Sequence, residues 1–313
     1  MIGLLFSGQG AQKTGMTQDL YEQIPEYRLT INKASDILNI DLAKLLFDPD
    51  KQADLSSTRF CQPAILAVSY ALYQLLIKNI SFEKFSIGLS LGEYSALASS
   101  EAIDFKTVLQ VIKRRGELMQ AASEFKSSKM IAIMGADIEA VRAACKEASK
   151  VGVVSISNVN TPLQIVIGGE ESAVIFADKL LKADGKKTMP LAVSGAFHTL
   201  MMQPVQAQLY DELKKVSWSE CKYPVYSTTT QKKFIPQDLT ANLTQQLVSP
   251  TYFAKTLLQH ALGLNAVIEV GPGKTLVSFA HKTIPGLITC RLDSVKEFEK
   301  TITFLEKNYG FRR

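Results

Sequence analysis

The middle of the chain, from about residue 128 to residue 192, alternates short β-type runs with amphipathic helical runs. Four runs have the composition of strands and two have helical spacing: strands at 130–134, 151–156, 164–167 and 187–193, and helices at 137–147 and 170–181. The order is therefore βαββαβ. This order predicts a ferredoxin-like unit.

The two flanking parts of the chain alternate apolar strand-like runs with longer helical runs. The expected strands are 3–6, 85–87, 225–227 and 266–270, and the expected helices are 63–77, 93–102 and 104–122. Buried strands that alternate with helices are typical of an α/β fold with a mostly parallel sheet.

These patterns predict one large α/β domain made of residues 1–127 and 193–313. The small subdomain, residues 128–192, is inserted into it. A cleft between two such units is the usual place for a ligand.

Composition sets few limits beyond this fold class. The chain has 313 residues, of which 46% are apolar and 21% charged, as in an ordinary globular protein. The net charge of +5 is spread in short basic doublets rather than one long run. We therefore expect no nucleic-acid binding, although an acidic protein partner is compatible with this charge.

The four cysteines are far apart and form no C-x-x-C pair, so the sequence indicates neither a zinc site nor a disulfide framework. This favours a reducing, cytoplasmic setting. The apolar start, residues 1–6, is too short for a signal peptide. The longest apolar stretch, residues 63–77, carries polar residues at helical spacing and predicts a buried helix rather than a membrane span.

Residues 88–92, Gly-Leu-Ser-Leu-Gly, fit the G-x-S-x-G pattern of a nucleophile elbow. In such an elbow a serine lies on a strained turn between a strand and a helix, and small residues relieve the crowding. Ser90 is thus a candidate nucleophile, and the Leu91 N–H at the helix start is a candidate oxyanion donor. The alternative is an ordinary turn with two glycines.

A serine nucleophile needs a base, and the chain has only three histidines. His260 and His281 are each expected in the last turn of a helix, where an imidazole complements the helix dipole. His198 instead follows a predicted strand in a loop, which is where α/β proteins usually carry catalytic groups. His198 is therefore the candidate base, the alternative being a solvated loop histidine.

Arg115 lies in the predicted helix 104–122 on the same side as the apolar residues Val108, Ile112 and Met119. An arginine that points inward needs an anion. One interpretation is an internal ion pair with an acidic residue. The other is a guanidinium that binds a substrate carboxylate through two parallel hydrogen bonds.

Glycine-rich segments are further candidates for anion or nucleotide sites. Residues 8–12, Gly-Gln-Gly-Ala-Gln, follow the first strand, and their amides are a candidate second oxyanion donor, a tight turn being the alternative. Gly-Lys-Thr at 273–275 is not a P-loop, because Ile268 occupies the position of the first glycine.

Together, the motifs resemble the malonyl-CoA:acyl carrier protein transacylase family and the acyltransferase domains of polyketide synthases. The resemblance covers nearly the whole chain and rests on residues 8–12, 62–64, 88–94, 115–116, 196–198, 246–247 with Pro250, and 269–273. It implies an α/β-hydrolase-like domain with an inserted ferredoxin-like subdomain.

The resemblance also implies a role for each matching residue. Ser90 matches the nucleophile, His198 its base, and Arg115 the partner of the malonyl carboxylate. Three further positions match supporting roles: the amides of Gln9 and Leu91 as the oxyanion hole, Gln62 as a pocket side chain, and the main-chain carbonyl of Gln246 as the group that orients the histidine. That carbonyl takes the place of an acidic third member, which the sequence does not reveal.

Two departures from the family pattern stand out. Leu89 occupies the position before the nucleophile where the family usually has histidine, and Leu163 lies where glycine is common. Phe197, before the histidine, resembles malonyl-selective acyltransferases of polyketide synthases. This residue favours a freestanding enzyme that loads such a synthase over one of fatty-acid synthesis, and the sequence does not decide between the two pathways.

The sequence therefore predicts a cofactor-independent and metal-free transfer of a malonyl group from malonyl-CoA to an acyl carrier protein, by way of an ester on Ser90. Two alternatives stay open: a thioester hydrolase that uses the same residues, and a non-catalytic module that binds carrier proteins.

Overall fold

The computed structural model describes residues 1–78 and 80–310. Its larger sheet has five parallel strands in the order β7-β2-β1-β8-β9. These strands are β1 (Ile2–Phe6), β2 (Lys84–Gly88), β7 (Val225–Tyr226), β8 (Ala266–Val270) and β9 (Ile288–Arg291). A parallel sheet of this kind needs helices on both faces.

The strands β1 and β8 are buried along their whole length, and their side chains contribute to two hydrophobic cores, one on each face of the sheet. Alternate residues of β1 point to opposite faces, so Leu4 and Phe6 lie in one core and Leu5 in the other. The first core is built with α2 (Pro25–Leu38), α5 (Thr58–Ile77), α6 (Leu91–Ser99) and α7 (Phe105–Phe125), and the second with α12 (Phe253–Gln259) and α13 (Thr275–Thr283).

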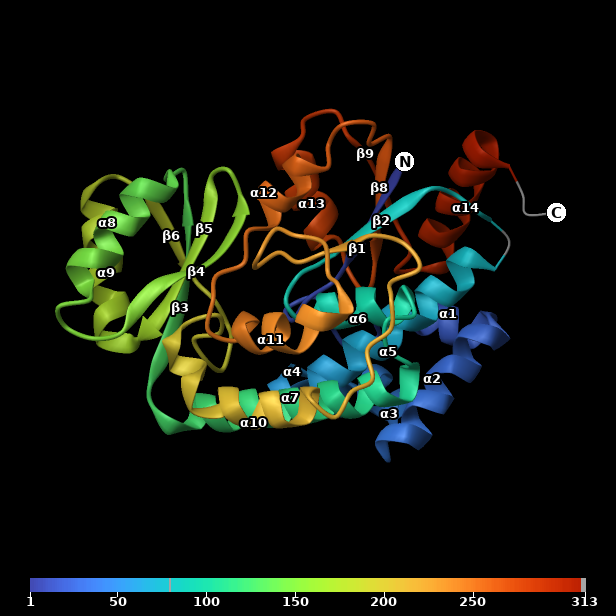
Figure 1. Ribbon diagram of the computed structural model, residues 1–313, viewed down its shortest axis with the longest axis horizontal. Coiled ribbons are helices and arrows are strands. Elements are labelled where there is room, and N and C mark those ends of the chain that lie inside the picture. The colour runs from blue at the N-terminus through green and yellow to red at the C-terminus, as the bar shows by residue number, and fades with distance from the viewer. Residues whose placement is uncertain (79, 311–313) are drawn as a thin grey trace.

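The second sheet has four antiparallel strands in the order β4-β5-β3-β6. It consists of β3 (Ser128–Met134), β4 (Val154–Thr161), β5 (Gln164–Glu170) and β6 (Lys187–Pro190). The helices α8 (Ile138–Ala148) and α9 (Glu171–Ala183) cover its outer face, at the left of Figure 1. The other face of this sheet packs against the first core through Met130, Ala132 and Val166.

The remaining helices complete the larger part of the molecule. They are α1 (Gln18–Gln23), α3 (Leu42–Phe47), the 3-10 helix η1 (Pro49–Lys51), α4 (Gln52–Ser56), the 3-10 helix η2 (Leu200–Val205), α10 (Gln206–Leu213), α11 (Pro236–Gln246) and α14 (Val295–Tyr309). Of these, α10 lies along α7 at the bottom of Figure 1.

The predicted α/β class and the ferredoxin-like strand order are confirmed, but several element ends were wrong, most clearly in three elements. The helix expected at 63–77 begins at Thr58, with Pro63 inside it. The strand expected at 151–156 is β4, three residues later at its start and five at its end. The strand expected at 187–193 ends at Pro190, after which the Leu191 N–H still donates to the Met130 carbonyl. The domain boundaries at 127 and 193 stay a prediction.

Helix α5 is long and apolar enough to cross a membrane, by length and composition alone. However, 72% of its most apolar window is buried inside the protein. It packs against α2, α6 and α7. The prediction of a buried helix is therefore confirmed.

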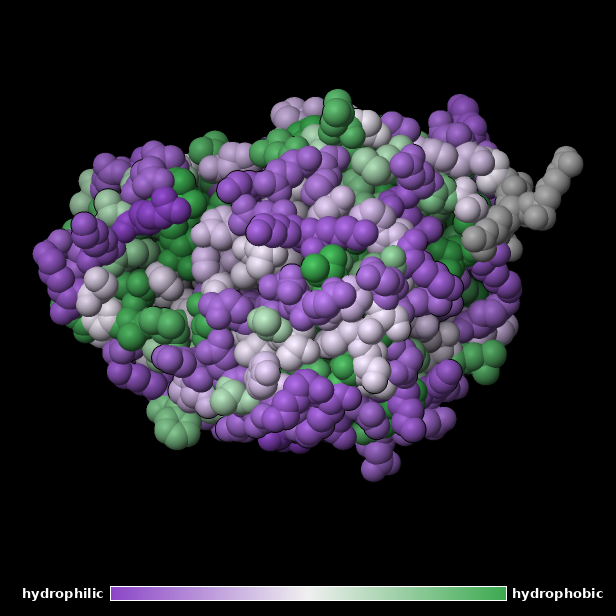
Figure 2. All heavy atoms as spheres, in the orientation of Figure 1, coloured by the Kyte–Doolittle hydropathy of each residue, from purple (hydrophilic) through white to green (hydrophobic). Residues whose placement is uncertain are grey.

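The visible surface is mostly polar (Figure 2), and the buried apolar residues among those described form three clusters inside. In Figure 2, polar side chains cover most of the visible face and apolar ones form separate small patches. All four cysteines are free thiols, and Cys61 and Cys145 are buried.

The junction of β1 and α6 depends on Gly92. A Cβ at this position would lie 2.1 Å from the Phe6 carbonyl oxygen, a backbone atom that cannot move aside alone. Only glycine, which has no Cβ, therefore fits at this position.

We predict that Gly92→Ala lowers the free energy of unfolding by about 3 kcal/mol, because the helix must move away from the sheet. Urea denaturation measures this change. Gly263→Ala is the matched control: Gly263 has φ 72° and open space around its Cβ position, so only backbone strain of about 1 kcal/mol applies. An equal or smaller loss for Gly92→Ala would contradict the packing argument.

Candidate active site

Ser90 lies on the sharp turn between β2 and α6. Its backbone has φ 56° and ψ −110°, a conformation that L-residues rarely adopt. A Cβ on Gly88 would lie 2.1 Å from the Glu93 nitrogen, so this glycine is needed for the chain to turn so tightly. The turn is thus a strained nucleophile elbow, as the G-x-S-x-G pattern predicts.

The loop after β1 lies directly beside this elbow. Phe6 pairs with Gly88 in the sheet, and the Leu89 N–H donates to the Phe6 carbonyl at 3.1 Å. A Cβ on Gly8 would lie 2.6 Å from the Leu89 carbonyl oxygen, so the two loops nearly touch. The carboxyl ends of neighbouring parallel strands therefore bring residues 7–11 next to Ser90.

Gln9 lines the same cleft as Ser90, and Leu91 follows Ser90 directly in the chain. Leu91 is the first residue of α6, where helix amides have no partner within the helix. Within residues 1–78 and 80–310, neither the Gln9 N–H nor the Leu91 N–H donates to a protein acceptor. Both amides are thus available to donate to an oxyanion. Their role as the pair of oxyanion donors stays a prediction.

His198 contacts Ser90 directly. Its Nε2 lies 2.8 Å from the Ser90 Oγ, and its Nδ1 lies 2.8 Å from the main-chain oxygen of Gln246. Gln246 is the last residue of α11, so its carbonyl has no partner within the helix. An Nδ1–H donated to this carbonyl leaves Nε2 free to accept the serine proton.

The His198 imidazole is buried, with 4% of its surface exposed. Burial and the positive charge of Arg115 lower the pKa of His198 to about 4, although the hydrogen bond to the Gln246 carbonyl acts in the opposite direction. The imidazole is therefore neutral near pH 7. A neutral imidazole is the form that serves as a base.

Arg115 is among the most deeply buried large side chains, with 1% exposed. Its Nη1 donates to the Gln62 Oε1 at 2.7 Å, and its Nη2 donates to the Gln246 Oε1 at 2.9 Å and to the Ser90 Oγ at 3.1 Å. Its guanidinium also lies over the Tyr94 ring, 5.3 Å from the centroid. Burial lowers the pKa of Arg115.

The partners of Arg115 decide between its two interpretations. All three hydrogen-bond acceptors are neutral, and in the part of the chain that the structure describes no carboxylate forms an ion pair with it. The internal ion pair is thus not the arrangement adopted. A buried cation with neutral partners beside a nucleophile is suited to an anionic substrate.

Gln62 and Gln9 connect the loop after β1 to helix α5. The Gln62 Nε2 lies 3.4 Å from the Gln9 Oε1, and the Gln9 Nε2 donates to the Thr58 Oγ1 at 3.1 Å. The side chain of Gln9 is thereby held by α5, which fixes its backbone amide. Gly116 lets α7 approach the start of α5 closely, since a Cβ there would lie 2.9 Å from the Thr58 carbonyl oxygen.

Sequence reasoning missed the role of Glu93 and Thr228. The Glu93 carboxylate is 1% exposed and accepts hydrogen bonds from the Gln246 Nε2 at 2.6 Å, the Thr228 N–H at 2.6 Å and the Thr228 Oγ1 at 2.8 Å. Burial raises the pKa of Glu93 to about 7. One signal was available: Glu93 is the only charged residue in the otherwise uncharged segment 85–100.

A cleft of about 520 Å³ opens over Ser90 and His198. The loop after β1 lines one side of it, and the inner face of the four-stranded sheet lines another, including Met130, Asn160 and Val166. Leu89, where the family usually has histidine, is half-buried and also lines the cleft. Its side chain packs against the second core.

The other two histidines lie in helix ends, as predicted. His260 caps the C-terminus of α12 and stacks on Tyr226, with ring centroids 3.6 Å apart, whereas His281 lies in the last turn of α13. The residues that the structure describes contain no group of three His, Cys, Asp or Glu that could hold a metal ion.

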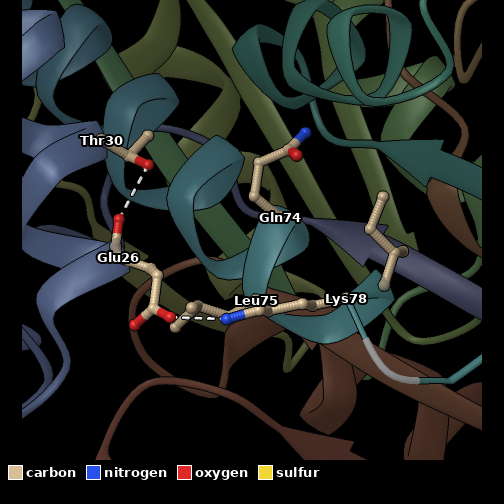
Figure 3. Close-up of a pocket in the computed structure, with 6 residues that line it drawn as sticks. Glu26, Thr30, Gln74, Leu75 and Lys78 are labelled. Atoms are coloured by element: carbon tan, nitrogen blue, oxygen red, sulfur yellow. Dashed lines mark hydrogen bonds and ion pairs between the residues drawn. The ribbon is translucent and has the colours of Figure 1, made fainter.

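A second hollow of about 370 Å³ lies between α2 and α5, away from Ser90 (Figure 3). It is lined by Glu26, Thr30, Gln74, Leu75, Ile77 and Lys78. Its charged groups, Glu26 and Lys78, form an ion pair with each other that is half exposed. Such a pair contributes little, and this hollow offers no reactive arrangement.

The fold and this arrangement of Ser90, His198 and Gln246 define a class of α/β proteins with a strained, histidine-paired serine. The chain belongs to the acyl transferase family, because the model of the acyl transferase domain matches residues 4–296.

Individual relatives are similar over almost the whole chain. A malonyl CoA-acyl carrier protein transacylase of Bacillus subtilis is 34% identical over 310 residues, which are 98% of each chain. A crystal structure of the Streptococcus pneumoniae MCAT superimposes with a TM-score of 0.91 at 38% identity, covering 98% of this chain and 100% of that one. A malonyl-transacylase in complex with its type II PKS acyl-carrier protein gives a TM-score of 0.93 at 33% identity, covering 98% and 99%.

We predict that Ser90 keeps its reactivity far into the acid range. Because the pKa of His198 is lowered to about 4, the base is present above that pH and is lost as the pH falls through it. The rate of acylation of Ser90 by p-nitrophenyl acetate, followed over short times by the total p-nitrophenol released, read at a wavelength where its two ionisation states absorb equally, should therefore fall near pH 4.

An acid limb near pH 6.5, the ordinary imidazole value, would contradict this prediction. Arg115→Gln provides a second check. It removes a nearby positive charge that lowers the pKa of His198, so the acid limb should move to higher pH.

Proposed function

We propose that this chain transfers a malonyl group from malonyl-CoA to the phosphopantetheine thiol of an acyl carrier protein, through an ester on Ser90. The observation that carries the proposal is the buried Arg115 guanidinium, which touches the Ser90 Oγ and has only neutral acceptors. An acyl group with a free carboxylate would place its charge at this guanidinium and its carbonyl at the serine. The names of the relatives support the same reaction.

In the first half-reaction, the Ser90 Oγ attacks the thioester carbonyl while His198 Nε2 takes its proton. Their separation of 2.8 Å suits this transfer. The negative oxygen that forms is stabilised by the amides of Gln9 and Leu91. When the carbon–sulfur bond breaks, His198 returns the proton to the leaving CoA thiolate.

In the second half-reaction, the carrier thiol takes the place of CoA. His198 removes its proton, the sulfur attacks the malonyl ester, and Ser90 leaves with the proton from His198. Every step uses proton transfer and acyl exchange alone, so we propose that neither a metal nor a redox cofactor takes part. The four free cysteines support a cytoplasmic setting.

We predict that malonyl-CoA leaves a malonyl ester on Ser90 when no carrier protein is present. Mass spectrometry of the quenched, digested protein should locate the adduct on the peptide that contains Ser90. Ser90→Ala should carry none. A label on another residue, or the absence of a label on the wild-type protein, would overturn the proposal, and malonate released faster than carrier loading would favour the hydrolase.

We predict that Arg115→Ala changes acyl selectivity. Loss of a buried, charge-assisted pair should cost about 2–5 kcal/mol in the transition state for malonyl transfer and much less for an uncharged acyl group. The measurement is kcat/KM for malonyl-CoA and acetyl-CoA with one carrier protein. If both values fell equally, Arg115 would not bind the carboxylate.

A further inference from the structure

Glu93 lies behind the nucleophile elbow, on the first turn of α6. Its carboxylate contacts two residues, Thr228 and Gln246, and neither Ser90 nor His198 is among the hydrogen-bond partners of that carboxylate. Two donors from Thr228 hold one carboxylate oxygen, and the Gln246 Nε2 holds the other. The carboxylate is therefore fixed, with one oxygen directed at the amide of Gln246.

The amide of Gln246 lies between an acid and a base. Its Nε2 donates to Glu93 and to the Ser90 carbonyl at 3.1 Å, and its Oε1 accepts from Arg115. A carboxylate only accepts and a guanidinium only donates, so these two neighbours together allow one orientation of the amide. Glu93 is thereby one of three groups, with Arg115 and the Ser90 carbonyl, that fix which end of Gln246 faces Arg115.

This arrangement also places a negative charge near Arg115 without direct contact. A carboxylate bonded to the guanidinium would compete with an acidic substrate for the same N–H groups. A carboxylate that acts through one amide instead offsets the buried charge and leaves the side of the guanidinium toward Ser90 available.

We propose that Glu93 is a positioning residue for the acyl-binding arginine, acting through the side chain of Gln246. This inference rests on the proposed function, because it assumes that Arg115 binds the substrate carboxylate. Gln246 then has two tasks: its main-chain carbonyl orients His198, and its side chain orients Arg115.

Glu93→Gln tests the proposal. The substituted side chain keeps one oxygen for Thr228 but presents an NH2 group to the NH2 group of Gln246. The two donors cannot bond to each other, so the Gln246 amide must move and its acceptor for Arg115 is displaced. We expect the ratio of kcat/KM for malonyl-CoA to the rate constant for p-nitrophenyl acetate to fall about 10- to 100-fold at pH 8.

Glu269→Gln is the matched control. Glu269 is an equally buried acid with a similarly raised pKa of about 7, but it accepts from the Ser7 Oγ at 3.1 Å and the Val277 N–H at 2.9 Å. Because it supports the loop after β1, which serves both substrates, its replacement should change both rates together. The same behaviour in Glu93→Gln, or an unchanged ratio, would overturn the inference.

Glu93→Asp separates charge from shape and serves if Glu93→Gln does not fold, as judged by circular dichroism. Aspartate keeps the charge but is shorter, so we expect a ratio below that of the wild type and, where Glu93→Gln folds, above that of Glu93→Gln. A folded Glu93→Asp protein with an unchanged ratio would show that the contact with Gln246 is not needed and would overturn the inference, as would a ratio below that of Glu93→Gln where both variants fold. If Arg115 does not bind the malonyl carboxylate, the proposed function itself fails. In that case Arg115→Ala would have the same ratio of kcat/KM for malonyl-CoA to the rate constant for p-nitrophenyl acetate as the wild type.

Discussion

The close approach of β1, β2 and α6 determines the geometry of everything around Ser90. Gly8 and Gly92 lie where a Cβ would meet the backbone of a neighbouring segment. Only with these glycines can the loop after β1 and the start of α6 meet at the serine. Tight backbone packing of this kind permits few alternative positions, so it holds the strained Ser90 conformation in place.

Burial gives the polar groups of the site their chemical character. Removal from water lowers the pKa of His198 to about 4 and raises that of Glu93 to about 7. The two shifts have one cause and opposite sign because the cost falls on the charged form of each group. Gln246 connects these groups, bonding to His198 through its main chain and to Glu93 and Arg115 through its side chain.

Features that depend on neighbouring residues in the chain could be predicted from the sequence, whereas features that depend on contacts between distant segments could not. The periodicity of short segments was enough for the α/β class and the βαββαβ order. Element ends depended on contacts elsewhere: α5 extends back to Thr58, where the Gln120 side chain accepts the Thr58 N–H. The inward position of Arg115 could be predicted from helical spacing, but its partners could not, because they come from α5, α6 and α11.

The sequence by itself singled out the candidate nucleophile, its candidate base and the inward-facing arginine, since each depends on local pattern or on there being three histidines to choose from. Tertiary structure alone decided how they act together. It brought the Gln246 carbonyl to His198 and gave Arg115 neutral partners, and it directed the Glu93 carboxylate at the Gln246 amide. Hydrogen bonds depend on distances and directions in space, and residues that are 48 to 153 positions apart meet only when the chain has folded.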